Sequence, residues 1–80
     1  MQMLFKSDYL KLKNLLKYFD KPSLLDICSK AGVSEYEKEL IISLQQDKTR
    51  IEMCFELNIS EWKYTKDMKK AISKIKRYLN

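Results

Sequence analysis

The stretch from Ser60 to Leu79 reads S-E-W-K-Y-T-K-D-M-K-K-A-I-S-K-I-K-R-Y-L and predicts a long last helix. Its apolar residues recur at steps of three and four, which makes one stripe for packing against the rest of the chain. The stripe consists of Tyr64, Met68, Ala71, Ile72, Ile75, Tyr78 and Leu79. A different face carries Lys66, Lys70, Ser73 and Arg77. We therefore expect one face of this helix to pack and another to meet negative charge.

The positive charge of the chain is concentrated in the same stretch. It holds seven basic and two acidic residues, so its net charge equals the formal charge of +5 of all 80 residues. Residues 1–60 hold nine basic and nine acidic residues, which cancel. Charge gathered on one helix attracts polyanions better than the same charge spread over a surface. A lysine-rich, solvated face would give the same count, so charge alone leaves both interpretations open.

The composition predicts a compact all-α domain with short loops. The chain has one Gly and one Pro, and 45% of its residues are hydrophobic and 34% charged. The longest apolar run, Leu40 to Ile42, is too short to cross a bilayer, and no signal-peptide core follows Met1 to Phe5. These features predict a cytoplasmic protein that has no membrane partner.

The residue inventory argues against an enzyme or a metal protein. The chain has no His, no glycine-rich phosphate loop, no clustered carboxylate pair and no C-x-x-C motif. We therefore expect no catalytic residue, no metal site and no cofactor. Cys28 and Cys54 have apolar neighbours and are expected to be reduced, small buried residues.

Helix-starting and helix-ending residues divide the chain into five helices. The first is expected to start after Ser7, and its core face is formed by Leu12, Leu15, Leu16 and Phe19. The segment Asp20–Ser23 contains the Pro and starts a second, short helix. That helix is expected to end at Gly32, which can take the left-handed conformation of a C-cap.

Two capping boxes open the third and fourth helices. Ser34 is followed three residues later by Glu37, and Thr49 in the same way by Glu52. Asn58 is expected to form a left-handed turn, after which Ser60 caps the last helix. Segments 26–36 and 52–62 share this arrangement at an offset of 26 residues, which we interpret as a shared structural solution rather than proof of duplication.

The segment from Arg50 to Leu79 resembles the C-terminal promoter-recognition domain of bacterial sigma factors, whose helix-turn-helix also occurs in small phage and mobile-element regulators. The residues that match the family's pattern are Cys54, Leu57, Asn58, Ile59, Ser60, Tyr64, Ala71, Ile72 and Ile75. The resemblance extends over about residues 34 to 79, since Glu37 to Leu44 fits the family's supporting helix. Asn58 stands where the family usually has Gly, and Trp62 and Tyr64 are bulkier than usual.

The resemblance implies a DNA interface at the N-terminal half of the last helix, which would enter the major groove. The implied base-edge contacts are Glu61, Trp62, Thr65, Lys66 and Lys69, and the implied phosphate contacts are Thr49, Arg50, Lys63 and Lys70. Trp62 could also be a hydrophobic staple or the anchor for a protein partner. Glu61 could either accept from cytosine or only favour the helix dipole.

The sequence thus predicts a single helical domain over 1–80, with N-terminal helices in 1–33 and a helix-turn-helix unit in 34–80. The expected function is that of a DNA-binding transcription regulator, and the expected partner is duplex DNA. The alternative is a protein-interaction module that binds RNA polymerase or another regulatory protein. Both a monomer and a homodimer are compatible with the sequence. Phe5 and Tyr9 are expected to be exposed and leave room for a dimer or partner surface at the N-terminus.

Overall fold

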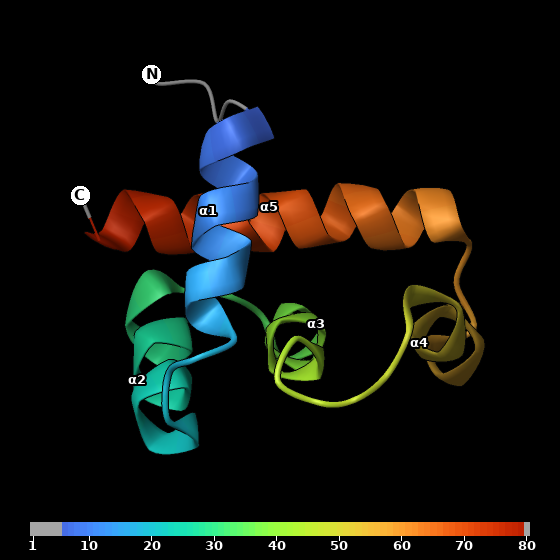
Figure 1. The fold of residues 1–80 in the computed structure, drawn as a ribbon, viewed down its shortest axis with the longest axis horizontal. Helices are drawn as coiled ribbons and strands as arrows, with labels where there is room; N and C mark the ends of the chain where they lie inside the picture. The colour runs from blue at the N-terminus through green and yellow to red at the C-terminus, as the bar shows by residue number, and fades with distance from the viewer. Residues whose placement is uncertain (1–5, 80) are drawn as a thin grey trace.

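The computed structural model describes residues 6–79, and over this range it contains five α-helices and no strand. The helices are α1 (Lys6–Leu16), α2 (Lys21–Ala31), α3 (Glu35–Ser43), α4 (Arg50–Leu57) and α5 (Glu61–Leu79). This confirms the expected all-α architecture of five helices. α5 runs along the longest axis of the molecule, and each of the other four helices contacts it (Figure 1).

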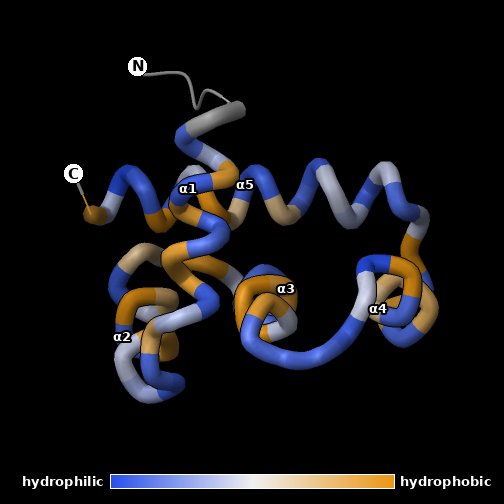
Figure 2. The backbone as a smooth tube through the Cα atoms, in the orientation of Figure 1, coloured by the Kyte–Doolittle hydropathy of each residue, from blue (hydrophilic) through white to orange (hydrophobic). Residues whose placement is uncertain are grey.

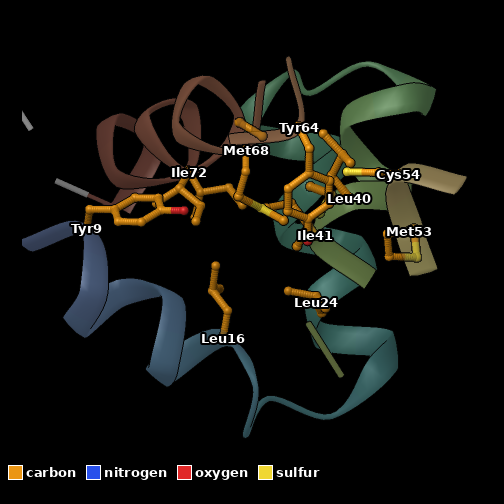
Figure 3. Close-up of a cluster of buried hydrophobic side chains, with 13 residues drawn as sticks. Tyr9, Leu16, Leu24, Leu40, Ile41, Met53, Cys54, Tyr64, Met68 and Ile72 are labelled. Carbon is orange, nitrogen blue, oxygen red and sulfur yellow. The ribbon is translucent and has the colours of Figure 1, made fainter. Parts of the chain in front are cut away.

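The predicted packing stripe of α5 forms the centre of the core. Its members Tyr64, Met68, Ala71, Ile72 and Ile75 are all buried. Side chains from the other four helices cover them (Figure 3), and hydrophobic and hydrophilic residues alternate along the whole of α5 (Figure 2). Burying one such large apolar side chain contributes about 1.5–3 kcal/mol to folding. The stripe is therefore what fixes α5 against the rest of the chain.

The end of the stripe was predicted wrongly. Tyr78 and Leu79 are 43% and 46% exposed. They lie in the last turn of α5, which extends beyond the helices that cover the rest of the stripe (Figure 1).

The first helix differs from the prediction in its ends and in its buried face. It begins at Lys6, so Ser7 lies inside the helix, and it ends at Leu16 rather than at Phe19. Leu12, Leu16 and Phe19 pack on the core as predicted, but Leu15 is 51% exposed and Tyr9 joins the packed face in addition. Tyr9, expected at an exposed partner surface, is buried, while Phe5 lies outside the described residues.

The helix caps confirm the predicted connections. Ser34 and Thr49 both form complete capping boxes, with Glu37 and Glu52 respectively. Ser60 accepts a hydrogen bond from the backbone N–H of Lys63 at 3.1 Å, as an N-cap residue does.

The two left-handed turns close α2 and α4 in the same way. Gly32 has φ 76° and Asn58 has φ 57°. The residue after each turn donates its N–H to the carbonyl five residues back, to that of Cys28 at 3.2 Å and to that of Cys54 at 3.0 Å. Both cysteines are buried and free, and burial raises the pKa of the Cys28 thiol, which favours its protonated form. The 26-residue similarity thus corresponds to one repeated backbone arrangement.

Candidate nucleic-acid interface

The residues predicted to contact DNA lie at the start of α4 and along the first half of α5. Burial of the packing stripe turns the remaining side chains of α5 outward, since a helix that buries one face must expose the other. Of the nine residues predicted to contact DNA, Thr65 is half-buried and the other eight are exposed. The exposed ones are Thr49, Arg50, Glu61, Trp62, Lys63, Lys66, Lys69 and Lys70. The fold therefore brings the two predicted segments to the accessible surface.

Arg50 and Glu61 are the pair that joins these two segments. The Nε of Arg50 lies 3.2 Å from Oε1 of Glu61, and both side chains are more than half exposed. The pair links the first residue of α4 to the first residue of α5. It uses one N–H of the guanidinium, which has five, so further donors of Arg50 remain for an anion.

Thr49 has a role in the structure that limits its side chain. Its hydroxyl accepts from the backbone N–H of Glu52 at 3.1 Å and lies 3.1 Å from the carboxylate of the same residue. Both hydrogen-bonding functions of the hydroxyl are thus used inside the capping box. Thr49 fixes the start of α4 and with it the position of Arg50.

Trp62 and Lys66 form an exposed pair one helical turn apart. The ammonium nitrogen of Lys66 lies 4.9 Å from the centre of the Trp62 ring system, which is a cation–π distance. Trp62 itself is 72% exposed. The pair presents a flat apolar surface and a positive charge side by side.

The charge of Lys63 is already paired within the protein, although its side chain is exposed. Its ammonium group donates to Asp67 at 2.9 Å and lies 5.5 Å from the ring of Tyr36 in α3. The hydroxyl of Tyr36 donates to the same carboxylate at 2.7 Å. Hydrogen bonds from Lys63 and Tyr36 lower the pKa of Asp67, while burial and the contact with Asp67 raise the pKa of Tyr36 to about 12. Any phosphate contact by Lys63 would have to compete with this network.

A second group of basic residues, which the sequence pattern does not reveal, lies beside Arg50. A cleft of about 530 Å³ lies between α1, the segment from Leu44 to Thr49, and the start of α4. Its lining includes the basic residues Lys13, Lys17, Lys48 and Arg50. In the sequence, Lys13 and Lys17 show only as residues off the core face of their helix. Their position beside Arg50 depends on how α1 packs, which helical periodicity does not reveal.

A further feature of the surface is apolar. On α4, Ile51 and Phe55 lie one turn apart and are 68% and 87% exposed. Single exposed apolar residues are common, but an almost fully exposed Phe next to an exposed Ile on one helix face is a typical element of protein contacts.

Neither a metal site nor a membrane span is found in the part of the chain that the structure describes. Within residues 6–79, no three side chains of the Asp, Glu, Cys or His type are grouped so that they could hold a metal ion. None of the five helices combines the length and the apolar character needed to cross a bilayer.

Comparisons of the chain with models of protein families, with curated proteins and with solved structures give no match.

Proposed function

We propose that this protein binds duplex DNA and acts as a transcription regulator, with α4 and α5 as a helix-turn-helix. The observation that carries the proposal is a set of exposed basic residues on α5, Lys66, Lys69, Lys70 and Arg77, in the stretch whose net charge equals the +5 of the chain. In the proposed complex, the first half of α5 enters the major groove and Arg50 contacts a phosphate. A role in transcription implies a cytoplasmic protein that binds rather than catalyses, and it agrees with the resemblance to sigma-factor promoter-recognition domains.

The proposed division of roles follows the contacts of each residue. Lys66, Lys69 and Lys70 are exposed on α5, and none of them forms an ion pair with a carboxylate of the described residues. They are therefore the cations that a polyanion can engage at the smallest cost. Lys63 is engaged by Asp67, so we give it a supporting role in holding α5 against α3.

The experiment that tests the proposal is binding to random-sequence duplex DNA across a salt series, followed by selection of a preferred site. Some four to six phosphate contacts give a log–log slope of affinity against salt on the order of −4 to −5. Absence of binding to any duplex at about 50 mM salt, where phosphate contacts are strongest, would exclude the DNA function.

The second candidate is a protein-interaction module, and the exposure of Ile51, Phe55 and Trp62 favours it. Aromatic residues are enriched among the anchors of protein interfaces. The partner would be RNA polymerase or another regulatory protein. Under this hypothesis a Phe55→Ala variant loses the protein partner and keeps its affinity for DNA. Under the first hypothesis Phe55 contacts no partner that the function requires, and the variant keeps its affinity for DNA as well.

A further inference from the structure

The cleft between α1 and the start of α4 gathers positive charge from three segments of the chain. Lys13 and Lys17 come from α1 and the turn that follows it, Lys48 from the connection between α3 and α4, and Arg50 from α4. One carboxylate, that of Asp47, also lines the cleft. The remaining lining residues are divided equally between polar and apolar ones: Ser43, Gln46 and Thr49, and Leu44, Ile51 and Tyr64.

The charges in this cleft are only partly compensated. Lys48 pairs with Glu56 at 2.9 Å, and Arg50 uses its Nε for Glu61. Among the described residues no carboxylate forms an ion pair with Lys13 or Lys17. The pKa of Lys13 is lowered by burial first and then by the positive charges of Lys17 and Arg50. An anion in the cleft would relieve this mutual repulsion.

One lysine of the cleft and one lysine of α5 share an aromatic neighbour, Tyr9. Lys13 from α1 and Lys69 from α5 both lie against the ring of Tyr9, with their ammonium nitrogens 5.8 Å and 6.0 Å from its centre. In Figure 1, α1 crosses α5 on the near side. A polyanion lying on Lys69 would therefore lie close to Lys13 of α1.

We propose that this cleft binds a phosphate group, which Lys13 and Lys17 contact together with the free guanidinium nitrogens of Arg50. A cleft of about 530 Å³ has room for one phosphate and its water. The phosphate can come from the backbone of a nucleic acid or from a free phosphate compound. That the phosphate belongs to DNA rests on the proposed function. If the phosphate belongs to DNA, α1 is part of the DNA interface.

The test compares two double variants of the full chain that lose the same charge. Lys13→Gln/Lys17→Gln removes the α1 cations of the cleft, while Lys11→Gln/Lys21→Gln removes two exposed lysines that do not line it. Lys13→Arg/Lys17→Arg keeps the charge and should retain binding. Thermal unfolding checks that each variant is folded. If Lys13→Gln/Lys17→Gln does not fold, the single variant Lys17→Gln replaces it, because Lys17 is exposed.

Two measurements are made on each variant. Titration with inorganic pyrophosphate is followed by the amide NMR shifts of residues 13–17 and 44–51. Binding to a duplex is followed across a salt series. We expect the Gln variant of the cleft to lose about tenfold in pyrophosphate affinity, as fits the loss of charge-assisted hydrogen bonds. If both lysines contact DNA, the salt slope falls by about 2, since each contact contributes about 0.9.

The outcomes separate the two sources of phosphate and the two proposals. Loss of pyrophosphate binding together with a reduced slope supports a DNA phosphate in the cleft, and loss of pyrophosphate binding with an unchanged slope supports a free phosphate compound. Pyrophosphate binding in the cleft of a protein that binds no duplex supports the phosphate site and overturns the DNA function. The phosphate site is overturned if pyrophosphate shifts no amide of the cleft, or if the two Gln variants behave alike.

Discussion

Arg50 and Glu61 form an ion pair, with Nε 3.2 Å from Oε1, that joins the first residue of α4 to the first residue of α5. The two residues are eleven positions apart and both were expected at the DNA interface as separate contacts. Because both side chains are more than half exposed, the pair contributes little to stability, within about 1 kcal/mol. Its consequence is positional, since it links the starts of the two helices, and Arg50 also lines the cleft beside α1.

Arg50→Ala should weaken binding to all duplex sequences about equally and make the salt slope less steep by about one. The reason is that a phosphate contact positions the protein without distinguishing bases. Affinities for matched and mismatched duplexes across a salt series measure this. Lys30→Ala is the matched control, because Lys30 is also an exposed cation in an ion pair, but on α2. A loss confined to the preferred site would contradict a phosphate role.

Lys66→Ala should cost roughly 1–3 kcal/mol on the preferred site and relax the preference at one base position. Lys66 is exposed on the first half of α5, where side chains of a recognition helix reach base edges. Site selection repeated with the variant measures the change. Lys74→Ala is not a suitable control, since Lys74 pairs with Glu37. Lys21→Ala, an exposed change at the start of α2, serves instead. If Lys66→Ala behaves like Arg50→Ala on all sites, α5 does not distinguish bases.

Trp62→Ala distinguishes the two candidate functions. Trp62 is 72% exposed and carries the ammonium group of Lys66 at 4.9 Å, so its removal also frees Lys66. A DNA-binding protein should lose affinity for its preferred duplex with this change. A protein-interaction module should keep its DNA affinity and lose its partner. Trp62→Phe keeps an aromatic ring under Lys66 and is expected to retain most of the function in either case.

The sequence was informative where local geometry decides the structure. Gly32, Ser34, Thr49, Asn58 and Ser60 were all placed at helix ends, and the structure confirms each of them. A cap is decided by residues within three or four positions, so the chain reveals it directly. The central part of the α5 stripe was predicted for the same reason, because periodicity is local.

Contacts between distant segments could not be predicted. Helical periodicity says which face of α1 is apolar but not which helix covers it, so Tyr9 was misplaced and the position of Lys13 and Lys17 near Arg50 was missed. The bond from Tyr36 to Asp67 spans 31 positions and depends on the packing of α3 on α5. The DNA function and the base contacts likewise remain predictions, because a fold does not specify a partner.

Asn58→Ala should destabilise the protein by about 1 kcal/mol, because an L-residue with a Cβ is strained in the left-handed region. Asn58 has φ 57° and ψ 48°, and Asn tolerates this conformation better than Ala. Asn58→Gly should be neutral or slightly stabilising at the same position. Chemical denaturation of both variants measures the difference. Equal stability of the Ala and Gly variants would show that the turn relaxes to another conformation.

Glu37→Gln should reduce the loss of stability that the protein suffers in acid. The carboxylate of Glu37 is buried, lies 2.7 Å from the ammonium nitrogen of Lys74, and accepts the N–H of Ser34 at 2.9 Å. Burial alone would raise its pKa, but the bonds from Lys74 and Ser34 outweigh burial and hold the pKa below its usual value. A carboxyl group whose pKa is lower in the folded than in the unfolded state stabilises the fold above its ordinary pKa of about 4.3.

This contribution is lost as the pH falls through the lowered pKa of the folded state, when the proton neutralises the partner of Lys74. Free energies of unfolding between about pH 3 and pH 7 should therefore decline less steeply for Glu37→Gln than for the wild type. At pH 7 the variant should be less stable by roughly 1–3 kcal/mol, since a buried hydrogen bond to a charged group is weakened. Asp67 also has a lowered pKa, so part of the acid dependence remains in the variant. Glu39→Gln, an exposed change on the same helix, is the matched control. If this variant flattened the dependence of the free energy of unfolding on pH as much as Glu37→Gln does, the acid dependence would not come from the contact between α3 and α5.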